Sequence, residues 1–495
     1  MALLDADCYP PTHQQKQAKI ETFIQSIDPD AVCQLASQHH DSEPCRIFQN
    51  TANGSFNVCF FVEFPARGTR WVVRIPLVSS VYNVWDKVQS EVATIRYLEE
   101  KTKIPVPHVH AFGPADTADE RNPLGLAFMI IDYIPGQSLD VVSFLEGPSE
   151  RREHFYSQLI DILAELRQQE FDQAGSLMPD PCGTSTPVLG PLQSMQLNEL
   201  QVARGCEAVR PATYDSVAGF AWHQFEVLNQ KYQLPLSEMG LRTAQLEVFG
   251  LHNMKQCMSD YVESEDSRGP FVLAHQDLRW SNIIVDESLN IQAILDWEWT
   301  TTVPRQFFIP PTWFAGRTPE WAAGVHYRIE YHWFFQVLRS KAETSQPCQQ
   351  LAQEWGNNLA SKVGFVLAVM LRHHSDFLAL YYRGIFRKSF KTPIDETLAQ
   401  FFAADDSTGL FAQDVQQRLE KSERYTQYLK DRGLFVARKL PKGTKSLPAD
   451  QEEPSRDTTG DNQPARSDAT SLPRSPATAP QATAPEVSSS ARQPG

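Results

Sequence analysis

The chain has 495 residues, of which 41% are hydrophobic, and it carries a formal net charge of -15 at pH 7. This length suffices for a large two-lobed unit with a buried core. The acidic balance argues against nucleic acid as a partner, because surfaces that bind nucleic acid are basic.

The first residues, MALLDADCYPPTHQQ, lack the basic segment and apolar run of a secretory signal. The longest strongly apolar stretch, residues 364–371, is far too short to cross a bilayer. The eight cysteines are scattered, without the paired spacing of a zinc or redox site. We therefore expect a cytoplasmic protein with reduced thiols and no membrane partner.

The N-terminal part begins helical and then becomes β-rich. Residues 13–38 have a helical pattern broken at Asp28 and Pro29, where the aspartate can cap a second helix. The runs NVCFFVEF and TRWVVRIPL, joined by a turn at residues 65–68, predict a hairpin. A helix is expected over residues 87–100, and the run LAFMIIDYIPG predicts a buried strand that leads into a turn.

The chain beyond Gly136 is predicted to be mainly helical. Apolar residues at three- and four-residue steps predict one helix with a core-facing stripe: Phe155, Leu159, Ile162, Leu163 and Leu166. Further helical patterns cover residues 220–232, 244–262 and 364–382, and residues 178–192 are rich in Pro and Gly, which predicts a surface loop. From Leu440 onward nine prolines and no aromatic residue predict a disordered tail.

A hairpin with a polar open end is predicted in residues 273–299, LAHQDLRWSNIIVDESLNIQAILDWEW. Two apolar runs flank the turn-forming residues 286–290. Pairing of these runs about the turn places Asn282 opposite Asp296 at the open end. Amide and carboxylate oxygens suit a hard octahedral cation, so the sequence predicts that this pair binds Mg²⁺.

The loop before this hairpin carries two groups suited to phosphoryl transfer. Asp277 lies five residues before Asn282 and is expected at the same end of the hairpin. Phosphoryl transfer requires a carboxylate that orients the acceptor hydroxyl and a cation that meets charge on the transferring group. Asp277 is the candidate carboxylate, and Arg279 is the candidate cation.

The two-part motif HQDLRWSN (275–282) and ILDWE (294–298) resembles the catalytic and metal motifs of the aminoglycoside phosphotransferase and choline kinase superfamily. More narrowly, it resembles the fungal phosphotransferase-family proteins. The resemblance covers about residues 45–432 in lobe order. It implies an α+β, bilobal protein-kinase-like fold with a small β-rich N-lobe and a larger, mainly helical C-lobe.

The same resemblance implies roles for individual residues. Asp277 matches the catalytic base or hydroxyl-orienting group, and Asn282 and Asp296 match the magnesium ligands. Arg279 lies where related kinases contact the γ-phosphate of ATP. His275 matches a histidine that braces the loop, so its expected role is structural.

Upstream residues are expected to complete the nucleotide site. Arg74 lies where kinases carry the strand lysine that holds the α- and β-phosphates, and Glu91 lies where the helix glutamate pairs with it. Arginine is bulkier than lysine and forks, so it is not an equivalent replacement. The turn over the phosphates and the inter-lobe hinge supply the remaining expected nucleotide contacts: Gly54, Ser55, Asp132 and Ile134.

Several of these residues could instead have a purely structural role. Arg74 and Glu91 would also suit an ordinary surface pair, and Gly54 with Ser55 an ordinary hairpin turn. Glu298 either contacts substrate or fixes its loop. The aromatic residues near the hairpin are expected to be core rather than substrate contacts: Trp297, Trp299, Phe307, Phe308, Trp313 and Phe314.

Four segments are predicted: an N-terminal helical segment (1–40), the N-lobe (41–135), the C-lobe with the catalytic loop and metal-binding hairpin (136–436) and the tail (437–495). The predicted activity is transfer of the γ-phosphate of ATP, with Mg²⁺, to a hydroxyl of a small-molecule acceptor. A pseudokinase-type nucleotide-binding scaffold is the main alternative, because Arg74 replaces lysine and the glycine loop is poor. A protein kinase is the second, disfavoured by the missing Ala-Pro-Glu segment.

Overall fold

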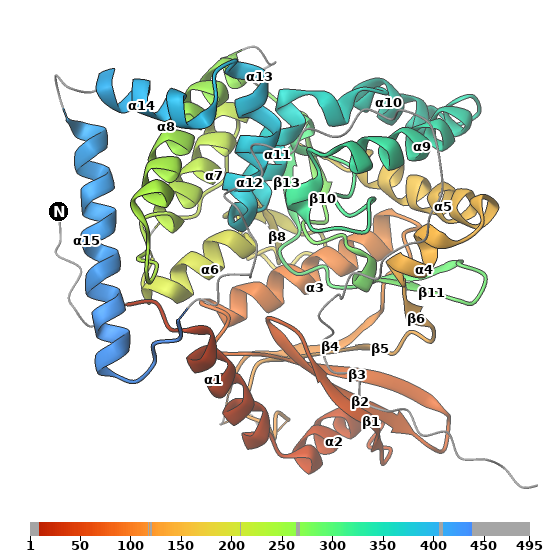
Figure 1. Ribbon diagram of the computed structural model, residues 1–495. Coiled ribbons are helices and arrows are strands. Elements are labelled where there is room, and N and C mark those ends of the chain that lie inside the picture. The colour runs from red at the N-terminus through yellow and green to blue at the C-terminus, as the bar shows by residue number, and fades with distance from the viewer. Residues whose placement is uncertain are drawn as a thin grey trace, which may run out of the picture. The chain divides into compact units, whose positions relative to one another are not determined.

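The computed structural model describes residues 9–437 except 117, 119–120, 208, 264–267 and 405–408. The described residues form one compact unit (Figure 1). Apart from residue 437, the predicted tail lies outside the described residues.

The smaller lobe is built on an antiparallel five-stranded sheet in the order β1-β2-β3-β5-β4. The predicted hairpin is confirmed as β2 and β3, and β1 is an additional strand at the edge of the sheet. The strands are β1 (Arg46–Asn53), β2 (Asn57–Phe64), β3 (Thr69–Pro76), β4 (Val109–Gly113) and β5 (Phe128–Asp132).

Helices cover the sheet and start where capping residues predict them. The break at Asp28 and Pro29 is confirmed: α1 (His13–Ser26) ends before it, and the Asp28 side chain caps α2 (Pro29–Gln38). The expected helix after β3 is α3 (Val84–Lys101), which begins three residues earlier than predicted because Asn83 caps it. Side chains of α3 are buried along most of its length, so it links the small lobe to the main core.

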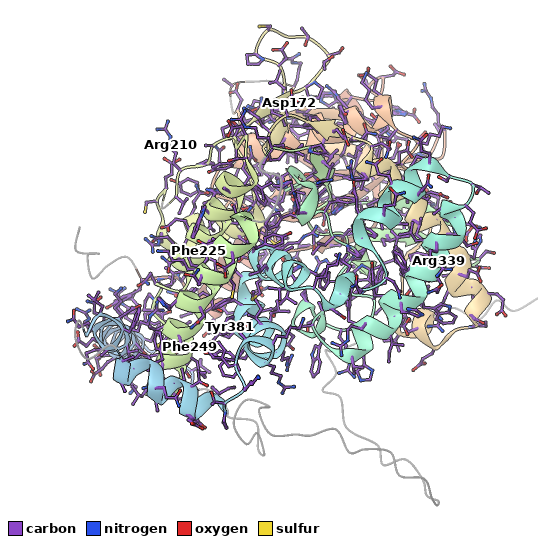
Figure 2. All side chains as sticks on the ribbon, turned by 90° about the horizontal axis from the view of Figure 1, so that it is seen from above. Asp172, Arg210, Phe225, Phe249, Arg339 and Tyr381 are labelled. Carbon is purple, nitrogen blue, oxygen red and sulfur yellow. The ribbon has the colours of Figure 1, made fainter. Side chains whose placement is uncertain are left out.

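The larger lobe is mainly helical, as predicted (Figure 1). The expected apolar stripe lies on α5 (Ser149–Arg167), and all five of its residues are buried. Figure 2 shows Phe249 and Tyr381 among these helices, with ring centroids 6.4 Å apart. The other α-helices are α4 (Val141–Glu146), α6 (Met195–Arg204), α7 (Val217–Lys231), α8 (Leu241–Glu263), α9 (Val325–Ala342), α10 (Gln346–Trp355), α11 (Val363–Arg372), α12 (Phe377–Leu380), α13 (Arg387–Ser389), α14 (Ile394–Ala404) and α15 (Leu410–Asp431).

Two predictions for this lobe were wrong in detail. The stretch 178–192 contains β9 (Val188–Gly190), which pairs with β8 (Ser176–Met178), so the surface loop is partly a short hairpin. The single helix expected over residues 364–382 is interrupted: α11 ends at Arg372, and a short 3₁₀ turn at residues 374–376 precedes α12. The break coincides with the polar run at residues 372–376, which interrupts an otherwise apolar stretch.

Two small sheets position the central loops. One joins β6 (Gln137–Ser138), β11 (Ile283–Val285) and β12 (Ile291–Ile294). The other, in the order β13-β10-β7, pairs β10 (Phe271–Ala274) with both of its neighbours. The outer strands of this second sheet are β13 (Thr301–Pro304) and β7 (Glu170–Phe171).

The N-terminal residues contact the C-terminal helix. The Tyr425 hydroxyl on α15 donates a hydrogen bond of 3.1 Å to the carbonyl of Pro10, and the Tyr9 ring packs against Tyr425 and Tyr428. Within the described ranges, no single helix is long and apolar enough to span a membrane. One pair, Val363–Arg372 with His374–Ser389, meets those criteria together but bends by 118° at its break.

Candidate nucleotide and acceptor site

The loop after β10 is braced by a buried histidine. The backbone N–H of Asp277 donates to Nδ1 of His275 at 3.1 Å, so the ring proton lies on Nε2, which donates to the carbonyl of Leu295 at 2.9 Å. Burial lowers the pKa of His275 to about 4, which keeps the ring neutral. These contacts tie the loop to the β12 end, in keeping with the structural role expected for His275.

Asp277 is held between an amide and a guanidinium. Asn282 Nδ2 donates to the Asp277 carbonyl at 2.9 Å and lies 3.3 Å from its Oδ2, and Arg279 Nε lies 3.1 Å from the same oxygen. Burial raises the pKa of Asp277 above its ordinary value, against the opposing charge of Arg279. The Arg279 side chain is 52% exposed, so part of its guanidinium remains open to a ligand.

The hairpin register differs by one residue from the prediction. Ile283 pairs with Ile294, and the N–H of Leu295 donates to the carbonyl of Asn282 at 2.8 Å, so Asn282 lies opposite Leu295 and not opposite Asp296. The pair of Val285 and Ile291 is centred on the turn, and the irregularity between Ile284 and Val285 shifts the partner of each preceding residue by one position, which puts Leu295 opposite Asn282. The prediction placed this partner one residue too far along the chain. Asp296 follows with φ of +67°, a left-handed conformation that is costly without glycine and often accompanies function.

Arg74 joins the two lobes. Its Nη1 lies 2.6 Å from Glu91 Oε1 on α3, and its Nη2 lies 2.5 Å from Asp296 Oδ1 after β12. The predicted pair of Arg74 and Glu91 therefore forms, and both residues are buried rather than at the surface. Burial alone would disfavour the charged arginine, but Glu91, Asp296 and Glu298 outweigh it and hold its pKa above the usual value.

A second buried cation, Lys87, was missed by the sequence analysis. It is 2% exposed, and its Nζ contacts Glu298 Oε2, lies 2.7 Å from Asn57 Oδ1 and lies 3.5 Å from Glu91 Oε2. Asn57 Nδ2 also donates to Glu298 at 2.8 Å. The one available signal was that Lys87 precedes Glu91 by one helical turn and faces the same way.

Burial raises the pKa of Glu298 to about 7. Lys87 opposes this shift, while the charges of Asp296 and Glu91 add to it. The cluster contains two cations, Arg74 and Lys87, against these three carboxylates. It therefore has an excess of negative charge when all members are ionised.

Nearly all predicted nucleotide and metal residues line one cavity of about 470 Å³ between the sheet and the hairpin. The exception is Glu91, which is absent from the lining and lies behind Arg74. We call this cavity the nucleotide cavity after that prediction. The predicted residues that line it are Gly54, Ser55, Arg74, Asp132, Ile134, Asp277, Arg279, Asn282 and Asp296.

The hinge forms one wall of the nucleotide cavity. The Asp132 carboxylate is engaged by two histidines, because it accepts from the N–H of His108 at 3.1 Å and lies 2.7 Å from His110 Nε2. His110 lowers the pKa of this carboxyl. Gly136 has φ of +136°, and a Cβ at this position would lie 2.8 Å from the carbonyl oxygen of Val285. Only glycine therefore lets the hinge pack this closely against β11.

The donor set at the cavity suits Mg²⁺. Asn282 and Asp296 present an amide and a carboxylate, and Arg74 occupies Oδ1 of Asp296, while Oδ2 has no partner among the described residues. No group of three or more His, Cys, Asp or Glu side chains within the described ranges is arranged around a metal position. Two protein ligands, with phosphate oxygens and water completing the shell, are the usual arrangement for Mg²⁺.

A sequence model described as the phosphotransferase enzyme family matches residues 51–307, just over half of the chain. This stretch contains every residue of the site described above. The chain belongs to the phosphotransferase enzyme family. Its α+β, bilobal kinase-like fold, predicted from the sequence, is thereby confirmed.

Individual proteins are more distantly similar to this phosphotransferase-family chain. It is 35% identical over 118 residues to altered inheritance of mitochondria protein 9, mitochondrial, of Clavispora lusitaniae, covering 23% of this chain and 19% of that protein. It is 23% identical over 268 residues to clavilactone A biosynthesis cluster protein Y of Ampulloclitocybe clavipes, covering 50% of this chain and 62% of that protein. The chain thus spans less than two thirds of either relative.

Among solved structures, an ethanolamine kinase of Plasmodium vivax is similar, with 13% sequence identity and a TM-score of 0.40. The alignment covers 79% of this chain and 96% of that one.

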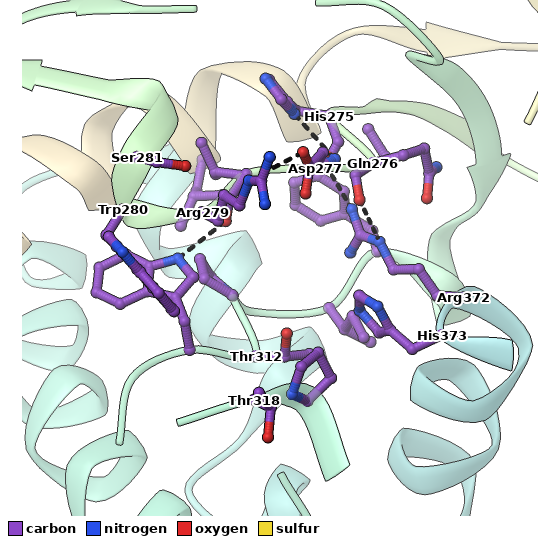
Figure 3. Close-up of a pocket in the computed structure, with 18 of the residues that line it drawn as sticks. His275, Gln276, Asp277, Arg279, Trp280, Ser281, Thr312, Thr318, Arg372 and His373 are labelled. Atoms are coloured by element: carbon purple, nitrogen blue, oxygen red, sulfur yellow. Dashed lines mark hydrogen bonds and ion pairs between the residues drawn. The ribbon is translucent and has the colours of Figure 1, made fainter. Parts of the chain in front are cut away.

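This phosphotransferase-family protein has a second cavity of about 540 Å³, which is also lined by the loop after β10 (Figure 3). Asp277 and Arg279 line both cavities. Arg372 supports the shared loop from α11, because its Nε donates to the carbonyl of Gln276 at 3.0 Å and its Nη2 donates to the carbonyl of His275. Trp313 and Phe308, expected to be core, are buried and also contribute to this wall.

Proposed function

We propose that this protein transfers the γ-phosphate of ATP to a hydroxyl group of a small molecule. The observation that carries the proposal is the position of Asp277, which lines both the nucleotide cavity and the second cavity. A carboxylate shared by two adjoining cavities can meet a nucleotide on one side and an acceptor hydroxyl on the other. Membership of the phosphotransferase enzyme family supports the same reaction class.

In this proposal each residue has a separate role that follows from its position. Asp277 orients the acceptor hydroxyl and takes its proton, while the acceptor oxygen bonds to the γ-phosphorus and the bond to the bridging oxygen breaks, releasing ADP. Asn282 and Asp296 would hold Mg²⁺, which offsets phosphate charge when bound. Arg279 faces the transferring group, and Arg74 faces the remaining phosphates.

The remaining predicted nucleotide contacts come from two walls of the nucleotide cavity, the turn between β1 and β2 and the hinge. Gly54 and Ser55 belong to the turn between β1 and β2 and line the nucleotide cavity, and the Gly54 N–H donates to the carbonyl of Asn57 at 3.0 Å, which fixes the shape of this turn beside the phosphates. Asp132 and Ile134 lie at the hinge, where backbone atoms would take the adenine. Their role as backbone contacts fits the Asp132 side chain, which is engaged by His108 and His110.

A second candidate function is a nucleotide-binding scaffold without turnover. One observation favours it: Arg74 Nη2 lies 2.5 Å from Asp296 Oδ1, so a strand cation already occupies one oxygen of a proposed metal ligand. The scaffold requires this pair to persist when nucleotide binds. The phosphotransferase requires Arg74 to turn from Asp296 toward phosphate.

The test uses the full-length protein with ATP and Mg²⁺ against amino alcohols, sugars and hydroxylated ring compounds, read by the mass gain of one phosphate on the acceptor. We expect Asp277→Asn to reduce turnover about 10²–10⁴-fold, the usual contribution of a positioned general base. Asp172→Asn is the control, because Asp172 is exposed and lines neither cavity. ATP binding without transfer to any acceptor would support the scaffold instead.

A further inference from the structure

The second cavity carries an unusual charge balance for a site next to a catalytic carboxylate. Asp277 and Arg279 form an ion pair of 3.1 Å and offset each other. Among the remaining lining residues, two arginines, Arg317 and Arg372, face a single carboxylate, Asp376. The lining therefore has a net positive charge.

The buried histidines do not alter this balance. Burial lowers the pKa of His275 to about 4 and that of His373 to about 3, so both rings are neutral near pH 7. Burial also lowers the pKa of Arg372, but only to about 10, so Arg372 keeps its charge. Arg317 is exposed at the rim, where its guanidinium lies 5.0 Å from the centre of the Trp321 ring.

The rest of the wall is largely apolar and rich in rings. Trp313 is buried and donates its indole N–H to the carbonyl of Leu278 at 2.9 Å, so only its apolar ring surface remains for a ligand. Trp280 is half-buried beside it, with ring centroids 6.2 Å apart in an edge-to-face arrangement. Other apolar residues of the lining include Leu163, Leu166, Phe308, Ile309, Pro311 and Pro319.

We propose that the acceptor is an alcohol or phenol with an apolar ring body and no positive charge. The inference rests on the proposed function and names the substrate class of the same site. A cavity lined by one sign of charge concentrates ligands of the opposite sign and repels its own. Flat apolar walls bind ring surfaces, since aromatic rings stack or meet edge to face.

The reacting end of such a molecule is fixed by the shared loop. Its hydroxyl oxygen bonds to the γ-phosphorus of ATP, the bond to ADP breaks, and the proton passes to Asp277. An ammonium group on the same molecule would lie in a cavity where Arg317 and Arg372 outnumber Asp376. Removing that ammonium from water without a surplus of carboxylates is unfavourable.

The decisive experiment compares phenols whose side chains end in groups of different charge. Tyrosol, para-hydroxyphenylacetate and tyramine share a phenol ring but end in a neutral, a negative and a positive group, and kanamycin serves as a polycation. With full-length protein, ATP and Mg²⁺, we expect kcat/KM for the neutral or negative compound to exceed that for tyramine at least about tenfold. Transfer restricted to tyramine or kanamycin would overturn the inference.

A charge-reversal variant tests the cause of this preference. Arg317→Glu changes the balance of the lining from one excess positive to one excess negative charge, so the preference should shift toward tyramine by about tenfold. Arg339→Glu makes the same change on the exposed face of α9, outside both cavities (Figure 2). Equal preferences in the two variants would show that cavity charge does not select the acceptor.

Calorimetric binding to the unchanged full-length protein, with Mg²⁺ and a non-hydrolysable ATP analogue, separates failure of the inference from failure of the proposed function. If none of these compounds takes phosphate and no ATP is consumed, the proposed function fails. Tyrosol or para-hydroxyphenylacetate binding more tightly than tyramine would then still support the ligand class. Tighter binding of tyramine would overturn it whatever the turnover result.

Discussion

Nη2 of Arg74 lies 2.5 Å from Oδ1 of Asp296, and this ion pair connects β3 to the loop after β12. The same guanidinium lies 2.6 Å from Glu91, so one buried arginine serves two carboxylates from different lobes. Charged hydrogen bonds of this length are among the stronger interactions in proteins. The orientation of the lobes and the ionisation of the site are therefore linked through Arg74.

Replacing Arg74 by methionine should strongly destabilise the protein. The change leaves Glu91 buried, with Lys87 as its remaining cationic partner, and removes the cation at Asp296. Breaking a buried pair by removing one partner typically costs about 3–5 kcal/mol. Denaturant unfolding measures the loss, and Arg70→Met on the same strand is the control, because Arg70 is half-exposed and should leave the midpoint nearly unchanged. Equal midpoints for the two variants would contradict the buried role.

Lys87 and Glu298 should show energetic coupling across the lobe boundary. Lys87 is 1% exposed at its side chain and Glu298 6%, and Asn57 binds both. In a double-mutant cycle with Lys87→Met and Glu298→Gln, we expect a coupling of about 1–3 kcal/mol, as found for residues within one network. Lys101→Met, at the exposed end of α3, is the matched control. Additive losses would mean that the two residues act independently.

The predictability of this site depended on how far apart its members lie in sequence. Asp277, Asn282 and Asp296 lie within one loop and hairpin, so local pattern and spacing brought them to one cavity. Lys87 and Glu298 meet only through the packing of α3 against the loop after β12, and no periodicity in either segment indicates the other.

The register of the hairpin was predicted one residue too far along the chain. Strict symmetry about the turn would put residue 294 opposite Asn282, and the irregularity between Ile284 and Val285 moves that partner to Leu295, one residue short of Asp296. Asp296 still reaches the cavity because its left-handed backbone turns the chain there. Such conformations depend on tertiary contacts, here the ion pair with Arg74, which a single segment does not contain.

Asp296→Asn should raise the concentration of Mg²⁺ that activity requires. The carboxylate provides the charged ligand of the proposed pair, and Asn282 adds only an amide oxygen. We expect the Mg²⁺ concentration for half-maximal turnover to rise at least about tenfold, by analogy with the 10–100-fold effects of perturbing metal shells. Titration of Mg²⁺ at fixed ATP measures this value, with Asp172→Asn as control. An unchanged requirement would remove Asp296 from the metal site.

The pH dependence of kcat/KM should report on Asp277. Its carboxylate must be ionised to accept the hydroxyl proton, so the rate falls as pH decreases through its pKa, which burial raises above the ordinary value. Arg279, with Nε 3.1 Å from Oδ2 of Asp277, opposes this shift by favouring the ionised form. Arg279→Gln removes that charge and should raise the pKa further, so the acid limb moves to higher pH even where the maximal rate also falls.

The direction of that shift separates two roles for Arg279. Loss of a phosphate contact alone lowers the rate at every pH and leaves the limb in place, whereas loss of the charge beside Asp277 moves the limb as well. Arg339→Gln controls for the change in net charge, because Arg339 lies outside both cavities. A limb that stays fixed or moves to lower pH would show that the ion pair does not govern the ionisation of Asp277 during turnover.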